Sequence, residues 1–365
     1  MSEWQTFCLK DLGKIVGGAT PPTNNPKNYG NKIAWITPKD LSTLQGRYIK
    51  KGSRSISRLG FKSCSCVLLP KHAILFSSRA PIGYVAIAEK RLCTNQGFKS
   101  IIPNKKIYFE FLYYLLKYHK DNISNIGGGT TFKEVSGATL GLFQVKIPPT
   151  YYEQQKIART LSVLDQKIEN NHKINELLHT LAYKIYEYYF KYKPKNAKLE
   201  QIIIENPKSN IMVKNAQKTQ DKYPFFTSGD NTLSYPKAII DGRNCFLNTG
   251  GNAGIKFYVG KASYSTDTWC IGANEFSDYL YLLLSSIKTH INQSFFQGTS
   301  LKHLQKNLLK KYPIYMPSVH EIKKFNQIMM PLLTLISINT RTSKKLEQIR
   351  DFLLPLLLKQ QVKPK

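Results

Sequence analysis

The chain has one glycine-rich run that could cradle a phosphate, Gly127-Gly128-Gly129, with Thr130 and Thr131 directly after it. A nucleotide-binding loop also needs a lysine beside the glycines and a buried strand before them, because the lysine contacts the phosphates and the strand positions the turn. The sequence around residue 127 shows neither feature. We therefore predict a turn at this position.

An enzyme that modifies or cuts nucleic acid would need other groups of residues. Methyltransferases that act on base amino groups use an Asn/Asp-Pro-Pro-aromatic tetrad. The nearest segment, residues 147–151, lacks the polar first residue and adds a spacer. Residues 316–318 come no closer, so we interpret both segments as steps into a helix. A nuclease site needs clustered carboxylates that hold a divalent ion. Acidic residues are scarce, and no recognised spacing links Asp40, Asp230, Asp241 and Asp267.

Cysteine and histidine spacings do not indicate a metal site. Cys64 and Cys66 have one residue between them where a zinc-binding pair needs two to four, so we expect reduced and mostly buried thiols. His172 and His179 lie seven residues apart on one predicted helix, which is not a metal-binding pair. We predict no catalytic residue, metal or cofactor in this chain. The start of the chain resembles no signal peptide and no run of eighteen apolar residues occurs, so we expect a cytoplasmic protein without membrane contact.

The charge of the chain is far from balanced. Fifty-three Lys and Arg residues stand against 23 Asp and Glu residues, which leaves a formal net charge of +30. Residues 1–150 hold half of this excess, with 22 basic and 7 acidic residues. A polyanion is the simplest partner for such a surface, and nucleic acid is the first candidate. An AT-rich genome, which raises the lysine content, is the alternative explanation for the excess.

The densest basic segment runs from residue 47 to residue 62 and contains no acidic residue. Serines separate several of its charges, which favours a loop or sheet edge that faces phosphates. A solvated charged face is the alternative, although such faces usually carry counter-charges. The basic residues of the segment are Arg47, Lys50, Lys51, Arg54, Arg58 and Lys62.

Most of the chain repeats itself at an offset of about 170 residues, which indicates an internal duplication. Residues 127–149 align with residues 297–318, and residues 74–83 align with residues 245–254. The similarity is weakest in the first seventy residues of each copy, where the basic segment has no evident counterpart. We expect two modules that share a scaffold but not a surface.

A long segment without glycine follows each module and carries a heptad pattern. Polar residues inside both seams cost stability but fix the register, so we predict that the two helices pair with each other. Separate packing of each helix on its own module is the alternative. Pro331 is expected to kink the second helix or to delay its regular part. The predicted seams are Ile157, Leu161, Leu164, Ile168, Asn171, Asn175, Leu178, Ala182, Ile185 and Tyr189 in the first helix, and Phe325, Met329, Leu332, Ile336, Asn339, Ser343, Leu346, Arg350 and Leu353 in the second.

Short β-rich runs, broken by Gly, Pro and Asn turns, occur in both modules, and each module has one clear helix, over residues 108–119 and 277–291. The predicted fold class is therefore α+β. It consists of two mixed α/β domains in tandem, each followed by a long helix, with the helices paired as an antiparallel coiled coil. The predicted boundaries are 1–148 for the first module, 149–193 for the first long helix, 194–317 for the second module and 318–361 for the second long helix. The β-rich runs are residues 32–37, 72–76, 83–88 and 256–259.

Several short segments of the first copy follow one another in a characteristic order and spacing. They are Trp4, Leu9 and Gly17-Gly18-Ala-Thr-Pro21, then Ile33-Ala-Trp35-Ile-Thr-Pro-Lys-Asp40-Leu, then Ile74-Leu-Phe-Ser-Ser-Arg79, Gly83 and Thr94-Asn95-Gln96-Gly97-Phe98, and finally Ile147-Pro-Pro149 with Glu153-Gln154. In this order they resemble the specificity subunit of type I restriction-modification systems, and the resemblance covers nearly the whole length of the chain. The second copy departs more, with Ser318 for the second proline, Glu321-Ile322 for Glu-Gln, and Thr266-Asp267 for Thr-Asn-Gln.

The resemblance implies a non-catalytic subunit whose two target-recognition domains each read one half of a bipartite, asymmetric double-stranded DNA sequence, while the paired helices act as a spacer. Methyltransferase (modification) subunits that carry S-adenosylmethionine, and restriction subunits that use ATP and Mg, would dock on it. The expected phosphate contacts of the first module are Arg47, Lys50, Lys51, Arg54 and Arg58, with Ser77, Ser78, Arg79, Thr130, Thr131 and Lys133 near bases or backbone. The matching set in the second module is Asn248, Thr249, Thr299, Ser300 and Lys302, with Arg243 and Lys256 beside them.

Two other functions stay open on the residues alone. A stand-alone, two-headed DNA-binding regulator would explain the duplication and the charge equally well. A remnant of a fused methyltransferase-nuclease is the other alternative, and the missing tetrad argues against it. The Gly-Thr-Thr segment and its counterpart could also be plain turns rather than DNA contacts.

Overall fold

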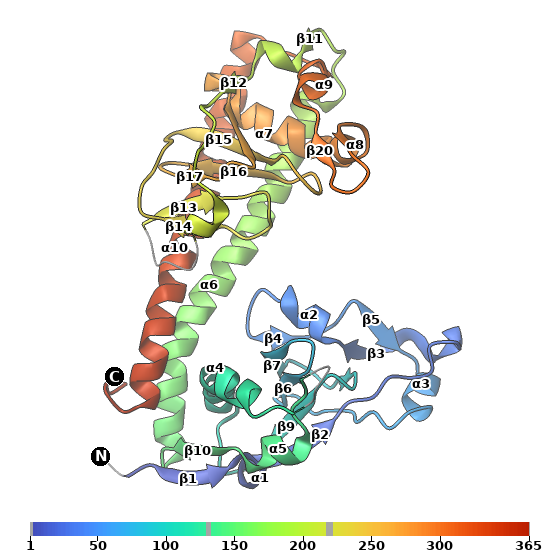
Figure 1. Cartoon of the computed structure of the whole chain (residues 1–365), viewed down its shortest axis with the longest axis vertical. Coiled ribbons are helices and arrows are strands. Elements are labelled where there is room, and N and C mark those ends of the chain that lie inside the picture. Colours follow the sequence, from blue (N-terminus) through green and yellow to red (C-terminus); the bar gives the residue numbers. More distant parts are fainter. Residues whose placement is uncertain (1–2, 129–132, 217–221, 365) are drawn as a thin grey trace. The chain divides into compact units, whose positions relative to one another are not determined.

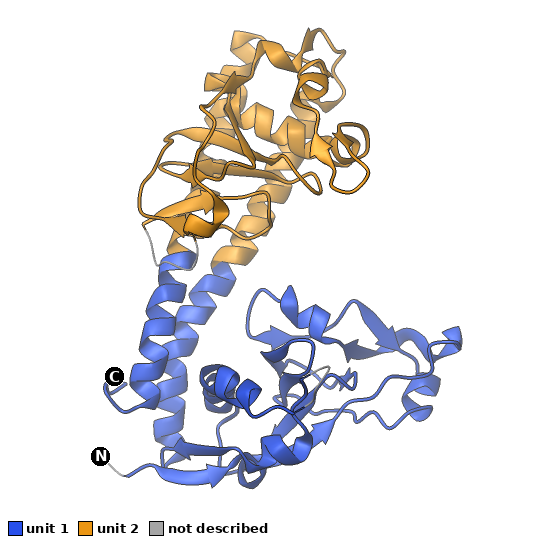
Figure 2. Cartoon of the chain, viewed as in Figure 1, with its two compact units in different colours: residues 1–170, 343–365 blue, residues 171–342 orange. Residues whose placement is uncertain are grey.

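The computed structural model describes residues 3–128, 133–216 and 222–364, which form two compact units. The first unit contains residues 1–170 and 343–365, and the second contains residues 171–342 (Figure 2). Each of the two long helices contributes one end to each unit. Every unit therefore consists of a mixed module packed on a segment of both helices.

The module of the first unit is built on two sheets (Figure 1). Helix α4 (Phe109–Asn125) packs on the larger sheet and buries Phe111, Leu112 and Leu115. The five-stranded sheet has the order β2-β9-β6-β7-β4, with bounds Gly13–Gly17, Lys99–Pro103, Ile74–Ser78, Ile82–Ala88 and Tyr48–Ile49. The three-stranded sheet has the order β5-β3-β8, with bounds Arg54–Ile56, Tyr29–Ile36 and Cys93–Thr94. Strands β1 (Gln5–Cys8) and β10 (Gln144–Ile147) pair separately, and short helices are α1 (Leu9–Leu12), η1 (Pro26–Asn28), α2 (Pro38–Ser42), α3 (Arg58–Lys62) and α5 (Gly137–Leu142).

The module of the second unit has the same plan. Its larger sheet has the order β12-β18-β15-β16, with bounds Ile204–Glu205, Thr268–Gly272, Arg243–Asn248 and Ile255–Val259. Its smaller sheet has the order β14-β13-β17, with bounds Leu233–Tyr235, Tyr223–Phe226 and Ser263–Tyr264. The remaining elements are β11 (Ala197–Lys198), η3 (Leu199–Gln201), η4 (Val213–Ala216), η5 (Asn274–Phe276), α7 (Ser277–Ser286), α8 (Lys288–Ser294), β19 (Phe296–Gln297), β20 (His303–Leu304), α9 (Lys306–Lys310) and β21 (Pro313–Ile314).

The duplication extends into the first seventy residues of each module, where the sequences no longer align. In the first module β3 pairs in parallel with β8, placing Trp35 opposite Cys93. In the second, β13 pairs in parallel with β17, placing Phe225 opposite Ser263. The chain between the paired strands is longer in the first module than in the second. The first module therefore has additional residues between these strands, and they include β4 and α3 of the basic segment.

The two long helices, α6 (Tyr151–Tyr186) and α10 (Val319–Leu358), lie side by side and run in opposite directions. In the first unit Arg350 Nη1 donates to Asp165 Oδ1 at 2.6 Å. In the second unit Asn339 Nδ2 donates to Asn175 Oδ1 at 2.9 Å. The predicted antiparallel pairing is thus confirmed, and the described seam residues are buried or half-buried. A π-helical turn, η2 (Glu187–Lys191), continues α6.

The structure excludes one of the two effects expected of Pro331 and divides one predicted helix. Helix α10 runs without a break through Pro331, so this proline does not delay the regular helix, while the kink stays a prediction. The side chains of Phe325, Met329 and Leu333 are completely or almost completely buried in the core of the second unit, and this packing holds the helix on both sides of the proline. The predicted helix over residues 277–291 is divided at Ile287 into α7 and α8.

The buried ion pair of the helix pair gives a stability prediction. Burial alone would lower the pKa of Arg350, but its hydrogen bonds with Asp351 and Asp165 raise it. Tyr114 also donates to Asp165, at 2.6 Å. Asp165→Ala is expected to lower the free energy of unfolding of the first unit by about 3 kcal/mol, because a mostly buried guanidinium loses its buried partner.

Hydrogen exchange of peptides from residues 1–170 measures this loss locally. The control is Arg79→Ala, which removes a half-exposed pair with Glu134 in the same unit and should change exchange very little. Equal losses in the two variants would contradict a special role for the buried pair.

Candidate nucleic-acid interface

The extra segment of the first module presents a group of exposed cations. Lys50 and Lys51 lie in the loop after β4, and this loop is held in place by Asp40 at the start of α2. The backbone N–H of Ser53 donates to Asp40 Oδ1 at 2.7 Å. Burial alone would raise the pKa of Asp40, but the hydrogen bonds from Ser53 and Thr37 lower it, so the carboxylate stays charged. The two lysines therefore project from an anchored loop.

Arg54 and Arg58 extend this cationic surface along β5 and α3. The guanidinium of Arg54 lies over the ring of Tyr29, 4.6 Å from its centre, which orients an otherwise exposed side chain. Ser57 caps α3 by accepting from the N–H of Gly60 at 3.0 Å, and Arg58 is the first residue of that helix. Lys62, at the end of α3, is also exposed. These side chains are exposed to solvent, and a contact of Arg54 and Arg58 with phosphates stays a prediction.

Arg47 is placed differently from the rest of the basic segment. Its side chain is only 7% exposed and donates to Glu110 Oε1 at 3.0 Å and to Glu169 Oε1 at 3.1 Å. Burial alone would lower the pKa of Arg47, but the acidic groups around it, Tyr114, Glu169 and Glu110, raise it. A buried guanidinium that holds two carboxylates cannot reach a phosphate here, so Arg47 leaves the set of DNA contacts.

The second candidate area of the first module is formed by two neighbouring loops. The N–H of Val135 donates to the carbonyl of Ser78 at 3.0 Å, which joins the glycine-rich segment to the turn after β6. Arg79, in that turn, donates to Glu134 at 3.5 Å and keeps its side chain 37% exposed, and Lys133 is exposed. Thr130 and Thr131 lie outside the described residues. The structure thus brings Arg79 and Lys133 together.

Ser77 and Ser78 do not reach the surface. The hydroxyl of Ser77 donates to the carbonyl of Pro81 at 2.8 Å and accepts from the N–H of Tyr84 at 2.8 Å. The hydroxyl of Ser78 donates to the carbonyl of Gly97 at 3.2 Å. Both side chains are completely buried, because they close the hairpin from inside. Their predicted role near bases is replaced by one in shaping the turn that carries Arg79.

The second module repeats the pair of loops. The N–H of Leu304 donates to the carbonyl of Thr249 at 3.0 Å, the counterpart of the bond between Val135 and Ser78. The N–H of Gly251 also donates to the carbonyl of Lys302 at 2.9 Å. The hydroxyl of Thr249 donates to the carbonyl of Asp267 at 2.7 Å, so this side chain is engaged within the protein. Thr299, Ser300 and Lys302 are exposed on the second loop.

Three predicted contacts of the second module are engaged in the interior. Asn248 is 6% exposed and donates to the carbonyl of Asn252 at 3.1 Å. Lys256 donates to the carbonyl of Thr227 at 2.6 Å, and burial lowers the pKa of its ammonium. Arg243 is paired with Asp278 and reaches α10. These side chains satisfy internal acceptors and leave the set of DNA contacts.

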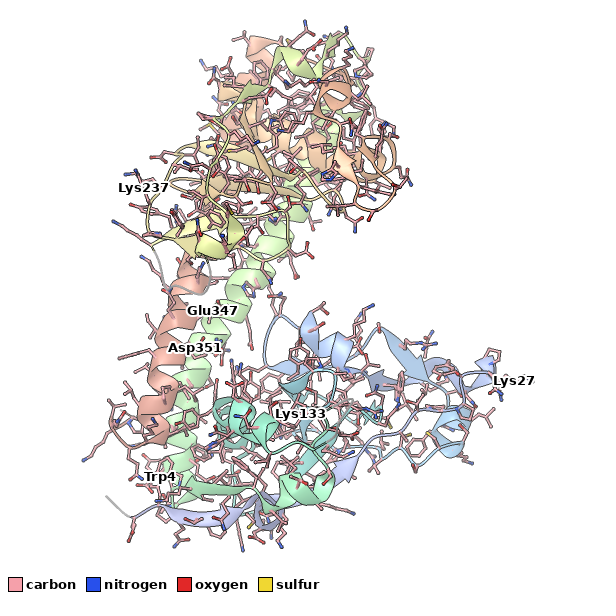
Figure 3. The ribbon with its side chains drawn as sticks, in the orientation of Figure 1. Trp4, Lys27, Lys133, Lys237, Glu347 and Asp351 are labelled. Carbon is pink, nitrogen blue, oxygen red and sulfur yellow. The ribbon has the colours of Figure 1, made fainter. Side chains whose placement is uncertain are left out.

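Figure 3 separates the two candidate areas of the first module. Lys27 lies at the end of the module that carries α3, and Lys133 lies well away from it. Lys27 belongs with the first area because its carbonyl accepts from the hydroxyl of Ser57 at 2.7 Å. Lys27 was missed in the sequence, where it stands well before the basic segment; only its position beside α3 identifies it. Tyr29 and Asp40 were missed for the same reason.

Comparison with known proteins identifies the family to which the chain is similar. Residues 1–180 and 195–348 match the family of the type I restriction modification DNA specificity domain. The chain belongs to this family. A relative from Methanocaldococcus jannaschii is the type I restriction enzyme MjaIX specificity subunit. The two sequences are 33% identical over an alignment of 405 positions, which covers 98% of this chain and 93% of that protein. As a type I specificity subunit with two recognition modules, the chain is a DNA-recognition component and not itself an enzyme.

Relatives of lower sequence identity are type I specificity subunits as well. A putative type I specificity subunit from Mycoplasma genitalium is 23% identical over 329 residues and is matched over 84% of this chain and 80% of its own length. The crystal structure of the S subunit of a type I restriction-modification system from M. genitalium has the same fold, with a TM-score of 0.65, 18% identity and coverage of 97% and 96%. Among the described residues, no helix of this specificity subunit is long and apolar enough to cross a membrane.

Proposed function

We propose that this specificity subunit reads a bipartite, asymmetric DNA sequence, with one module on each half. The observation that carries the proposal is the unequal duplication of the two modules. Most strands and their pairing are repeated, but only the first module has the additional strand β4 and carries the basic residues Lys50, Lys51, Arg54 and Arg58 beside it. A shared scaffold with different contact surfaces suits two different half-sites, whereas equal surfaces would suit a palindrome.

The paired helices act as the spacer in this proposal, within the domain limits of 149–193 and 318–361. Polar contacts between the helices fix their register in each unit, as with the half-buried Asn175 and Asn339. Methyltransferase and restriction subunits dock on this subunit, and those partners carry S-adenosylmethionine, ATP and Mg. Because DNA is the proposed target, we expect the complex to work in the cytoplasm. The chain by itself transfers no methyl group.

The DNA contacts that we propose are the exposed members of the predicted set. Their common property is a cationic or hydroxyl side chain at the surface of the β5–α3 segment or of the paired loops. They are Lys50, Lys51, Arg54, Arg58, Arg79 and Lys133 in the first module, and Thr299, Ser300 and Lys302 in the second.

Reconstitution tests the proposed function. The subunit is purified with and without the methyltransferase subunit of its own system and incubated with S-adenosylmethionine and genomic DNA, and methylated adenines are mapped by sequencing. We expect methylation only with both subunits, at a site with two different halves. A single continuous site, or methylation by this chain alone, would refute the proposal. Failure of the two proteins to co-purify would favour the stand-alone regulator.

Salt dependence tests the basic segment. Replacing Lys50, Lys51, Arg54 and Arg58 by glutamine should reduce the slope of log K against log salt by about 3 to 4, because each neutralised phosphate contributes about 0.9. Fluorescence anisotropy of the assembled complex on its DNA site at several salt concentrations measures the slope. Four other exposed cations of the first module, Lys71, Lys90, Arg91 and Lys105, serve as the control set. An equal change in both sets would contradict a localised contact.

A further inference from the structure

Each module carries an acidic side chain at the same place in the duplication, and an arginine holds it. Glu110 and Asp278 occupy corresponding positions of the repeat, in the first turns of α4 and α7. Arg47 Nη1 donates to Glu110 Oε1 at 3.0 Å. Arg243 donates to both carboxylate oxygens of Asp278, from Nε at 2.6 Å and from Nη2 at 2.7 Å. The two acidic positions are therefore equivalent in sequence and in contact.

Both arginines also donate hydrogen bonds to a long helix. Arg47 Nε donates to Glu169 Oε1 of α6 at 3.1 Å. Arg243 Nη1 donates to Thr334 Oγ1 of α10 at 2.9 Å, and its Nη2 lies 3.3 Å from the carbonyl oxygen of Met330 on the same helix. Each guanidinium thus joins three elements, namely its own segment, the helix of the module and the long helix.

A backbone N–H near each arginine also donates to the long helix, and the two acceptor residues occupy equivalent positions of the helices. The N–H of Arg47 donates to Glu169 Oε1 at 2.8 Å. The N–H of Val259 donates to Ser337 Oγ at 3.1 Å, and Ser337 is the counterpart of Glu169 when the two long helices are aligned. A glycine with positive φ adjoins both donors, Gly46 at +132° and Gly260 at +119°. A Cβ at Gly46 would lie 3.1 Å from the Glu169 side chain, so a larger residue would both strain the backbone and press on Glu169.

The two arginines do not occupy equivalent positions of the duplication. Arg47 directly precedes β4, a strand for which the second module has no counterpart, whereas Arg243 begins β15. The residue that aligns with Arg243 is His72, whose ring stacks on Phe109 at 4.0 Å. Two different arginines therefore make the same link. What the modules share is the connection between module and helix, and not one inherited side chain.

Because these arginine contacts are buried, they can fix the orientation of a module on its long helix. The side chains of Arg47, Glu110 and Glu169 are 7%, 13% and 16% exposed. Those of Arg243 and Asp278 are 17% and 1% exposed. Ion pairs with little access to water are costly to distort, because any displacement leaves a charge without a partner, and the planar guanidinium also fixes direction. Removing one helix contact therefore loosens the module without removing its core.

We propose that Arg47 and Arg243 are positioning residues that fix the orientation of each recognition module on its long helix, and so restrict the gap between half-sites that the subunit accepts. This inference rests on the proposed bipartite recognition. It assigns Arg47 and Arg243, which looked like DNA contacts in the sequence, to the control of spacing. The base preferences of the two halves do not depend on them.

The experiment removes one side-chain acceptor on the helix side of each link and leaves the arginine paired with its module, while the longer contact of Arg243 with the Met330 carbonyl oxygen remains. Glu169→Ala leaves Arg47 with Glu110, and Thr334→Val leaves Arg243 with Asp278. Conservative variants that retain an acceptor, Glu169→Gln and Thr334→Ser, should behave largely like the wild type. Controls are Glu176→Gln, an exposed carboxylate on α6, and Lys310→Met, which breaks a pair with Glu205 inside the second module.

Each subunit is assembled with the methyltransferase subunit and offered duplexes that carry the wild-type half-sites with gaps from two base pairs shorter to two longer. Glu169→Ala and Thr334→Val should lower the preference for the wild-type gap over its neighbours by about tenfold, the ratio that one charged hydrogen bond supports. Substitutions within either half-site should be rejected as before. Circular dichroism and assembly show that each variant is folded.

An unchanged gap preference in the folded variants would overturn the inference, and so would a change of base preference without a change of gap. If Glu169→Ala does not assemble, Thr334→Val decides, because it is nearly isosteric and removes no charge. The wild-type arm separates the two proposals. Absence of any preferred gap in the wild-type complex refutes bipartite recognition itself, whereas a preferred gap that all variants keep refutes only the role of the arginines.

Discussion

Insertion of one heptad into both long helices is expected to lengthen the recognised gap by about three base pairs, since seven residues add about 10.5 Å and one base pair spans about 3.4 Å. The insertions belong after Asn170 and after Thr342, where the two units meet along the chain. A whole heptad preserves the seam, so Asp165 and Arg350, like Asn175 and Asn339, stay opposite each other. Mapping methylated adenines in a host that carries the variant measures the new gap.

The matched control inserts seven residues into α6 alone, which breaks the register of the antiparallel pair. This variant should lose assembly or methylation rather than acquire a new gap. Altered bases at an unaltered gap in the double insertion would show that the helices do not act as the spacer. Because three base pairs also rotate one half-site about the DNA axis by roughly a quarter of a turn or more, we expect lower activity at the new gap than at the original one.

Replacement of residues 1–148 by the first module of a relative is expected to change one half of the DNA site and to leave the other half intact. The exchanged segment includes both β1 and β10, so their pairing is carried over complete. Discrimination between the old and the new half-site should reverse by about a thousandfold or more, the usual range between specific and non-specific binding. Methylation mapping reads both halves in one experiment.

The reciprocal exchange of residues 194–317, which carries β11 with β21, is the control and should change only the other half. Changes in both halves after one exchange would contradict independent recognition by the modules. The structure adds one condition for the design. The incoming first module must offer Glu169 a donor like Arg47, and without it the chimaera should also show a relaxed gap.

Much of the scaffold could be predicted from the sequence, because its signals are local. The heptads of α6 and α10 repeat within single segments, and their burial follows from that period. The corresponding loops at Val135 and Leu304 were found by alignment, and their hydrogen bonds are repeated as well. At Pro331 the local argument left a kink and a delay open, and the delay is excluded because packing on both sides of the proline keeps the helix continuous.

The contact residues depended on tertiary structure, because burial is set by partners far away in the sequence. Arg47 lies in a run of cations that look alike, yet Glu169, on a distant helix, takes it out of solvent. Ser77, Ser78, Asn248 and Arg243 are likewise engaged by internal groups. Polar side chains at a sheet edge suit DNA and internal acceptors equally well, so residue type cannot separate the two uses.

One part of the duplication is visible in the sequence, and another part only in the tertiary structure. The sequence by itself determined two modules, two paired helices and a repeat that covers most of the chain. Only the tertiary structure showed that the first strands are duplicated too, with Trp35 and Phe225 in equivalent pairings. Backbone hydrogen bonds specify strand pairing without requiring the same side chains, so the topology is repeated where the alignment fails. The additional basic residues of the first module could be recognised as an insertion only against that shared topology.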